Sequence, residues 1–272
     1  MGGDVRVLIK GAGDLATGVA VRLWRAGFRV AMTELEQPLA IRRSVAFSEA
    51  VYDGTAAVED VTARRVAQAA EAEAAWQAGV IPVLVDAEAW CRLTLKPEVL
   101  VDAVLAKRNS GTRLSDAPLV VGLGPGFTAG QDVHAVVETN RGHYLGRVLW
   151  SGSAQADTGT PGVVGGVGRE RVVYAPAEGS FKARLAIGAV VAPGDVIGWM
   201  DETPVKAPIA GVLRGLMREG VRLEAGVKMA DVDPRGVVDH CWTISDKALA
   251  IGGGVLEAIL VHLRHREAEH HG

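Results

Sequence analysis

The sequence contains little of several residue types that would specify particular classes of protein. Only two of its 272 residues are cysteines, Cys91 and Cys241, and they form no CxxC pair. This excludes a disulfide framework and a cysteine-based zinc site, and it is typical of a reducing cytoplasm. No block of Lys and Arg occurs and the formal net charge is −3, so nucleic acid is not an expected partner.

Long hydrophobic runs are also lacking. No run of about 20 uncharged apolar residues is long enough to span a membrane, and no basic and apolar leader precedes the first apolar segment. We therefore predict a cytoplasmic protein with no membrane partner. Aromatic residues make up only 5% of the chain, whereas 49% is hydrophobic, so the core is expected to pack small branched side chains in tight layers.

Metal-binding and nucleophile motifs are lacking as well. The sequence has no H-E-x-x-H, no Cys/His cluster and no G-x-S-x-G elbow. His134 and Glu138 lie four residues apart in a segment that alternates like a strand, which separates them by about 13 Å. We therefore predict no metal site.

The N-terminal segment has a strand–helix–strand pattern. Residues 5–10, VRVLIK, form a short apolar run without helical period, which predicts a buried strand. Apolar residues then recur at helical spacing until Gly27, and residues 28–36 are again strand-like. The turn after the first strand matches G-x-G-x-x-A, with Gly11, Ala12, Gly13, Asp14, Leu15 and Ala16.

This turn has the features of a dinucleotide-binding loop. Gly11 permits a tight turn, Gly13 lets a pyrophosphate approach the backbone, and Ala16 lets helix and strand pack closely. Amides at the helix N-terminus then face the anion. Glu34 follows at about the distance expected for an acid that holds a ribose hydroxyl. The alternative is a tight turn that binds nothing, and we expect Asp14 to cap the helix.

Strand-like and helix-like segments continue to alternate. We predict strands at residues 50–54, 80–86 and 117–124 and helices at 61–79 and 96–109, which together imply a parallel sheet of Rossmann type. Arg42 and Arg43 follow the second strand, where they are either phosphate-neutralising or ordinary surface residues.

A second glycine-rich loop follows the strand at 117–124. Its glycines and Thr128 form a candidate anion-binding nest, with Gly122, Gly124, Gly126 and Gly130. Residues 134–150 then predict two strands joined by a hairpin. The segment 151–168 is rich in Gly, Ser and Thr and is either a linker or a loop over a site.

The C-terminal half contains an internal repeat with an offset of about 32 residues. VYAPAEG at 173–179 matches VKAPIAG at 205–211, and Gly188 and Gly194 fall on Gly220 and Gly226. Each copy is too small to bury a core alone, so we predict two copies related by a pseudo-dyad in a small β structure.

This repeat resembles the biotinyl/lipoyl-carrier fold, the barrel-sandwich hybrid. That family modifies a lysine in the hairpin between its two halves. Here Met200 or Asp201 occupies the expected place, and Lys206 lies in the following strand. The resemblance therefore implies the carrier fold without the swinging arm.

The last segment predicts a strand at 240–245 and a glycine loop that leads into a helix. Gly252 and Gly253 would line an anion site ahead of that helix, with Lys247 as the cationic partner. The alternative is that these glycines allow a close helix contact.

Several long segments together resemble the YqeB family of accessory proteins of the selenium-dependent molybdenum hydroxylase system. They are KGAGDLATGVAVRLWRAGF, QPLAIRRSVAF, GLGPGFTAGQDVHAVVETNRGH, DVDPRG and ISDKALAIGGGVLEAIL. The resemblance implies a bacterial cytoplasmic maturation factor that helps to load or modify a molybdopterin-type cofactor. Its implied partner is the hydroxylase apoenzyme or its cofactor-loading machinery, docked against the β domain.

The predicted architecture is α/β. A Rossmann-like domain with a glycine-rich hairpin region covers 1–168, a barrel-sandwich hybrid covers 169–236, and a C-terminal strand and helix at 237–272 pack back on the first domain. The ligand is expected to be a dinucleotide, either NAD(P) or a molybdopterin (di)nucleotide. The alternatives are an NAD(P)-dependent oxidoreductase and a non-catalytic interaction module. Whether the chain is an enzyme, and whether it forms a homo-oligomer, both stay open at this point.

Overall fold

The computed structural model describes residues 4–270. The chain forms two compact units. Unit 1 comprises Met1–Pro38, Ala46–Asp157 and Ile244–Gly272, and unit 2 comprises Leu39–Val45 and Thr158–Thr243. The boundaries therefore lie after Asp157 and after Thr243 rather than at the predicted 168 and 236, and unit 2 also takes the short segment Leu39–Val45 from the first half of the sequence.

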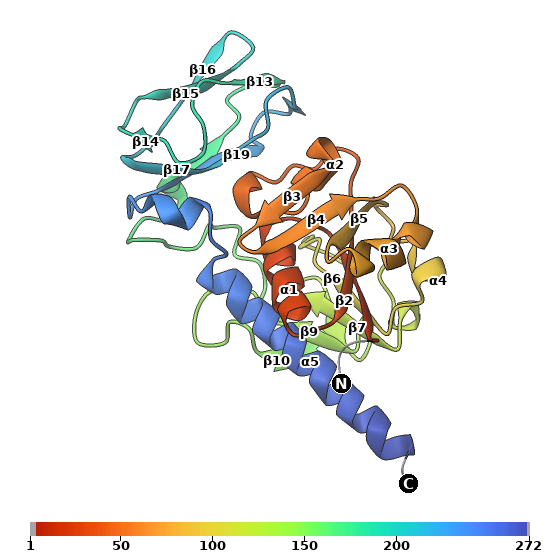
Figure 1. The fold of residues 1–272 in the computed structure, drawn as a ribbon. Helices are drawn as coiled ribbons and strands as arrows, with labels where there is room; N and C mark the ends of the chain where they lie inside the picture. The colour runs from red at the N-terminus through yellow and green to blue at the C-terminus, as the bar shows by residue number, and fades with distance from the viewer. Residues whose placement is uncertain (1–3, 271–272) are drawn as a thin grey trace. The chain divides into compact units, whose positions relative to one another are not determined.

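Unit 1 is built on a mixed sheet of nine strands in the order β10-β9-β7-β6-β1-β2-β5-β4-β3 (Figure 1). The pairs β3–β4 and β9–β10 are antiparallel, and the other neighbours are parallel. The strands are β1 (Arg6–Lys10), β2 (Arg29–Glu34), β3 (Thr55–Val58), β4 (Val61–Arg65), β5 (Ile81–Val85), β6 (Val99–Asp102), β7 (Leu119–Leu123), β9 (Ala135–Val137) and β10 (Val148–Leu149). A separate two-stranded sheet pairs β8 (Thr128–Ala129) with β11 (Gly152–Ser153).

The helices of unit 1 differ greatly in length. They are α1 (Asp14–Arg25), α2 (Glu49–Asp53), α3 (Ala72–Gln77), α4 (Arg92–Leu95) and α5 (Asp246–His270), with 3-10 turns η2 (Ala69–Glu71) and η3 (Leu114–Asp116). The long helix α5 packs along α1 (Figure 1). The contact is close because α1 presents Gly18, where an added Cβ would lie only 2.5 Å from the Cβ of Ala248.

The predicted strand–helix–strand unit is confirmed as β1, α1 and β2, but three other assignments are wrong. Residues 50–54 lie mostly in α2 rather than in a strand, and the predicted helix at 61–79 begins as strand β4. The predicted helix at 96–109 contains β6, which lies between β1 and β7. A short apolar run that is buried on both faces shows no periodicity of polar and apolar residues, so its sequence does not distinguish a strand from a helix. Pairing with the neighbouring strands of the sheet determines which of the two it forms.

Unit 2 contains eight strands, four from each copy of the repeat. The first copy supplies β12 (Val172–Tyr174), β13 (Gly179–Ala183), β14 (Val190–Val191) and β15 (Val196–Met200). The second supplies β16 (Thr203–Lys206), β17 (Gly211–Leu216), β18 (Arg222–Leu223) and β19 (Lys228–Asp233). Three 3-10 turns, η1 (Arg43–Val45), η4 (Arg169–Arg171) and η5 (Val238–Cys241), complete the unit.

The two copies of the repeat exchange strands. One sheet has the order β12-β19-β17-β14 and the other β16-β15-β13-β18. Each sheet therefore holds two strands of each copy, and corresponding strands occupy corresponding places. Both sheets contribute to one hydrophobic cluster, in which Phe181, Ile197, Leu213 and Met229 are fully buried. The predicted pairing of two repeats about a pseudo-dyad is confirmed by this strand order.

The predicted strand at 240–245 is wrong. Residues up to Cys241 form η5, and α5 begins at Asp246. Among the described residues, no helix combines the length and the apolar character needed to cross a bilayer.

Candidate functional site

The carboxyl ends of β1, β2 and β6 form the candidate site. β1 lies between β2 and β6, so the chain leaves β1 on one side and later returns on the other. Such a switch point in a parallel sheet is where ligands of α/β proteins usually bind. The loop after β1 contacts the loop after β6, since an added Cβ at Gly11 would lie 3.1 Å from the carbonyl oxygen of Ala103.

The first two glycines of the loop after β1 have different structural roles. Gly11 has a φ of +102°, a conformation that side chains disfavour, and it lies against the backbone of Ala103. Gly13 has a φ of −66° and a ψ of −177°, which any residue adopts, and no atom lies within 4 Å of an added Cβ. The fold therefore requires glycine at position 11 but not at position 13.

The N-terminus of α1 has no side-chain cap. Gly13 is the N-cap residue and has no side chain with which to cap the helix. Asp14 is the first residue of the helix, so the predicted capping by Asp14 is wrong; its charge instead favours the positive end of the helix dipole. The amides of Leu15 and Ala16 belong to the first turn, whose N–H groups have no partner within a helix.

Glu34 lies beside this loop, as the spacing predicts. Its Oε2 accepts a hydrogen bond of 2.9 Å from the backbone N–H of Ala12, and its Oε1 accepts one of 2.7 Å from Leu35. The carboxylate therefore holds the loop against β2. Each oxygen has a second lone pair, so Glu34 can still accept a hydroxyl of a ligand.

Apolar side chains are exposed around the same edge. Leu35 follows β2, and Val104 and Leu105 follow β6; all three are large hydrophobic residues with substantial exposure. Leu105 also has a φ of +59°, which is uncommon for a residue with a side chain. Exposed apolar groups beside polar backbone groups are typical of sites that bind a ring system and an anion together.

The second glycine loop is explained by packing. Added Cβ atoms at Gly122 and Gly124 would lie 2.5 Å from the ring of Phe127 and 2.4 Å from Oγ1 of Thr139. Gly126 has a φ of +105° and an added Cβ would lie 3.0 Å from the backbone of Arg108. The N–H of Gly124 donates to the carbonyl of Val137, so that amide is used within the fold.

Thr128 is likewise engaged within unit 1. Its backbone N–H donates to Asp132, and its hydroxyl bonds that of Ser153 at 3.0 Å. This contact joins the two strands of the small sheet.

The C-terminal glycines lie inside α5, so the predicted glycine loop ahead of a helix is wrong. The helix begins at Asp246, and Lys247 is its second residue. An added Cβ at Gly252 would lie 3.1 Å from the carbonyl oxygen of Gly18 and 3.1 Å from Cβ of Arg22. The alternative interpretation, a close contact between helices, accounts for Gly252, whereas Gly253 has open space around it.

Arg42 and Arg43 hold the backbone of unit 2. Arg42 donates to the carbonyl of His240 at 3.3 Å, and Arg43 donates to that of Leu216 at 2.7 Å. The backbone of the same segment is joined to the sheet by a hydrogen bond from Leu216 to Ile41. Both hydrogen bonds lie within unit 2.

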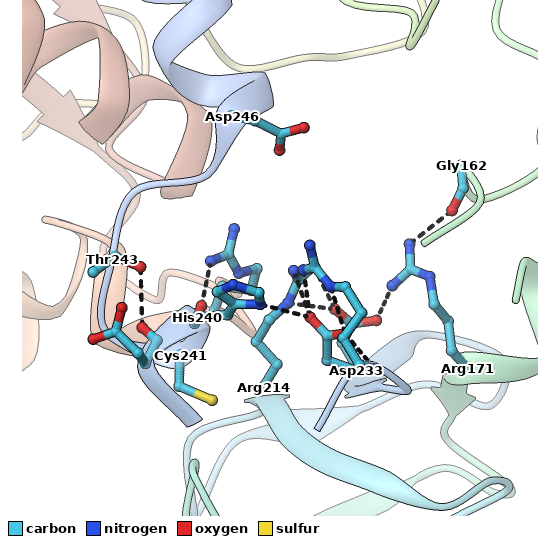
Figure 2. Close-up of polar contacts among 12 residues, drawn as sticks. Gly162, Arg171, Arg214, Asp233, His240, Cys241, Thr243 and Asp246 are labelled. Carbon is cyan, nitrogen blue, oxygen red and sulfur yellow. Dashed lines mark hydrogen bonds and ion pairs between the residues drawn. The ribbon is translucent and has the colours of Figure 1, made fainter. Parts of the chain in front are cut away.

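Unit 2 also contains a buried ionic network that the sequence analysis missed. Arg214 donates to Asp231 at 3.1 Å and to Asp233 at 3.0 Å, and Arg171 donates to the other oxygen of Asp231. Figure 2 shows Arg171, Arg214 and Asp233 with these contacts. All four side chains are buried, and Arg235 adds two hydrogen bonds to Asp233 from its partly exposed side chain.

The strand pattern explains where these side chains point. Ala230 and Val232 of β19 belong to the hydrophobic cluster, so the alternate residues Asp231 and Asp233 face the opposite side of the sheet. The register of β17 against β19 shifts between Leu213 and Gly215, and such an irregularity at Arg214 re-aims the side chain. Charged residues at alternate positions in KMADVD were the signal that could have revealed the network.

Acid is expected to weaken unit 2 through Asp233. Burial alone would raise the pKa of this carboxyl, but hydrogen bonds from Arg235 and the charges of Arg214 and Arg235 outweigh it and lower the pKa to about 2. A folded-state pKa below the ordinary value of 3.8 stabilises the fold above that value, and this stabilisation is lost as the pH falls toward 2.

Urea unfolding of the wild type between about pH 5 and about pH 2.5 checks this expectation. The free energy of unfolding should fall with decreasing pH, and the slope should be shallower in Asp233→Asn. Equal slopes in the two proteins would contradict the assignment.

The remaining candidate groups are structural. His134 accepts a hydrogen bond of 2.9 Å from the N–H of Val120, and burial lowers the pKa of the ring. Cys91 and Cys241 are free and buried; burial raises the pKa of the Cys91 thiol to about 12 and also raises that of Cys241. Within residues 4–270, no group of three or more His, Cys, Asp or Glu side chains is arranged to hold a metal.

Comparison with known proteins gives one close relative. The chain is 51% identical over 259 residues to the protein named "Uncharacterized protein YqeB" of Escherichia coli (strain K12). The chain is similar to YqeB. The match covers 95% of this chain but 48% of YqeB, so the chain spans about half the length of this relative. This similarity supports the resemblance to the YqeB family. No family model matches the chain.

Similarity to solved structures is weak. The ectoine utilization protein EutE (DoeB) from Ruegeria pomeroyi has a TM-score of 0.26 at 12% identity, with 85% of this chain and 86% of that chain covered. An aspartoacylase family protein from Mesorhizobium loti has a TM-score of 0.26 at 14% identity, with 85% of each chain covered. At these TM-scores neither neighbour bears on the fold or the function.

Proposed function

We propose that this chain belongs to the YqeB family and is a cytoplasmic accessory protein in the maturation of selenium-dependent molybdenum hydroxylases. In this role it binds a dinucleotide or a molybdopterin-type cofactor at the carboxyl edge of unit 1. The identity with YqeB supports the family, and the hydroxylase system rests on the resemblance of the long sequence segments.

One observation carries the binding part of the proposal. Gly13 is the N-cap residue of α1 although neither its backbone angles nor its surroundings require glycine. Glycine at this position keeps the first amides of the helix accessible to an anion. Unit 1 is then a Rossmann-like domain in which a phosphate lies at Gly13–Ala16 and Glu34 holds a ribose.

Unit 2 has a different proposed role. Its exchanged repeat supports a barrel-sandwich fold of the biotinyl/lipoyl type, used as a docking domain for the hydroxylase apoenzyme or its cofactor-loading machinery. Asp201 lies in the turn between β15 and β16, where carrier proteins have the modified lysine, and Lys206 ends β16. Intact mass spectrometry should therefore show no mass added on a lysine of the purified chain.

The second candidate is an NAD-dependent oxidoreductase, which the position of Glu34 favours. A carboxylate at the end of β2 accepts ribose hydroxyls and repels a 2′-phosphate, so NAD is preferred over NADP. Isothermal titration of the intact chain with NAD(H), NADP(H), ATP, CTP and molybdopterin dinucleotides separates the candidates. NADH binding with turnover favours the oxidoreductase, binding of a molybdopterin dinucleotide favours the accessory role, and no binding at all favours an interaction module.

Replacing Gly13 by aspartate should separate stability from binding. Aspartate is a preferred N-cap residue, so Gly13→Asp is expected to keep or slightly raise the free energy of unfolding, by a few tenths of a kcal/mol. Its carboxylate would occupy the first amides of α1 and repel a phosphate, which should weaken nucleotide binding by about 100-fold. Thermal unfolding without ligand and titration with the nucleotide that the wild type binds measure the two effects. Unchanged affinity would exclude the amides of α1 as the anion site.

A further inference from the structure

Three polar side chains lie in one row across the carboxyl edge of the sheet in unit 1. Thr33 of β2 pairs in register with Lys10 of β1, and Lys10 pairs in register with Asp102 of β6. All three are buried, with exposed fractions of 1%, 6% and 1%. Polar side chains are rarely buried to this degree without hydrogen-bond partners, so the burial of each of the three needs an explanation.

Two members of this row have no polar partner. Asp102 is satisfied, because its Oδ1 accepts from the N–H of Val104 and its Oδ2 accepts from the hydroxyl of Thr112. The Oγ1 of Thr33 has no hydrogen-bond partner. The ammonium of Lys10 makes no hydrogen bond or ion pair with any described residue, including its neighbour Asp102. The Nζ of Lys10 is not among the buried side-chain atoms that lack a partner, so the ammonium reaches solvent although only 6% of the residue is exposed, and it is free to bind an anion there.

The surroundings of Lys10 determine where its ammonium can lie. Strand residues two apart share a face, so Lys10 stands on the same face as Leu8. Leu8 pairs with Ala31 on one side and Leu100 on the other, and all three belong to the hydrophobic cluster. A long charged side chain extends away from such an apolar row, and for the last residue of β1 that direction is the carboxyl edge.

We propose that Lys10 binds an anionic phosphate oxygen of the ligand at the switch point between β1 and β6. This inference rests on the proposed binding of a nucleotide by unit 1 and assigns one residue of that site. The three donors of the ammonium bind the phosphate, the hydroxyl of Thr33 lies beside it in the row, and the amides of α1 bind the same phosphate or its neighbour. The neighbouring Asp102 organises the loop after β6 and leaves the ammonium to the ligand.

The test compares Lys10→Met with the wild type, both as intact chains. Methionine has a similar length without the charge, so the variant should unfold at about the same temperature in the absence of ligand, because the ammonium that it removes makes no contact within the fold. Inorganic pyrophosphate and NAD are the probes in isothermal titration. The variant should bind the probe that the wild type binds about 10- to 100-fold more weakly. Lys182→Met, which changes an exposed lysine of β13 in unit 2, should bind as the wild type does.

Each result decides a different part of the proposal. If the wild type and Lys10→Met bind with equal affinity, Lys10 is not a ligand-binding residue and the proposed function stands. If pyrophosphate binds in a Lys10-dependent way and no nucleotide does, the anion site stands and the nucleotide function fails. If the wild type binds no probe, both fail. A lower unfolding temperature of ligand-free Lys10→Met would show that Lys10 stabilises the fold, which overturns the inference.

Discussion

Replacing Arg214 by methionine is expected to lower the free energy of unfolding of unit 2 by about 3–5 kcal/mol. Arg214 is the residue that bonds both buried aspartates, Asp231 and Asp233. Its removal leaves each carboxylate buried with fewer donors, and a buried charge that loses its partner is costly to keep out of water. Asp231 would retain Arg171, and Asp233 would retain Arg235.

Arg222 provides a matched control in β18, the next strand along the chain, which belongs to the other sheet of unit 2. It forms an ion pair with Glu178 at 2.8 Å, and both side chains are largely exposed. Arg222→Met should therefore cost about 0–1 kcal/mol. Urea denaturation followed by far-ultraviolet circular dichroism gives both values. Similar losses in the two variants would show that the buried network contributes no more than a surface pair.

Replacing Gly254 by alanine is the second large expected effect, a loss of about 2–3 kcal/mol. An added Cβ at Gly254 would lie 2.2 Å from the carbonyl oxygen of Gly146 and 2.9 Å from Cγ1 of Val137. Gly146 cannot easily move away, because its φ is +80° and an added Cβ there would lie 2.6 Å from the carbonyl of Ala250. The methyl group therefore has to push α5 away from the loop before β10.

Gly253 is the matched control for this substitution, since it is the preceding residue of the same helix. No atom lies within 4 Å of an added Cβ at Gly253. Gly253→Ala should raise the free energy of unfolding by up to about 1 kcal/mol, because alanine is the better helix former. Thermal unfolding of the two variants gives the comparison. A stabilised Gly254→Ala would show that α5 does not pack on this loop as described.

The first half of the fold was predictable where local signals agreed with the sheet. The apolar run before Gly11, the helical spacing that ends at Gly27 and the next apolar run predicted β1, α1 and β2. The segment at 96–109 was assigned wrongly because the run Val99–Val101 fits a buried strand or a buried helix equally well. This run forms β6, and its pairing with β1 and β7 supplies the backbone hydrogen bonds that stabilise it as a strand.

The sequence predicted which glycines lie together in the fold but not why glycine is needed at each position. The spacing placed Gly11, Gly13 and Glu34 together, and the structure brings them to one edge. The same reasoning read Gly122, Gly124 and Gly252 as anion-binding, whereas each one lies where a side chain would collide with another part of unit 1. A glycine in the sequence indicates that a side chain would not fit at that position. Only the neighbouring atoms in the structure show whether a ligand or another part of the protein occupies the place of the side chain.

The sequence by itself determined the first strand–helix–strand unit and the duplication of the β domain. The first depends on the spacing of residues that are close together in the chain, and the second on residues that recur at one constant offset. Only the tertiary structure decided which strands the two repeats exchange, the ionic network around Arg214, and the row of Thr33, Lys10 and Asp102. These features depend on contacts between residues that are distant in sequence, and such contacts are set by strand register and packing rather than by local pattern.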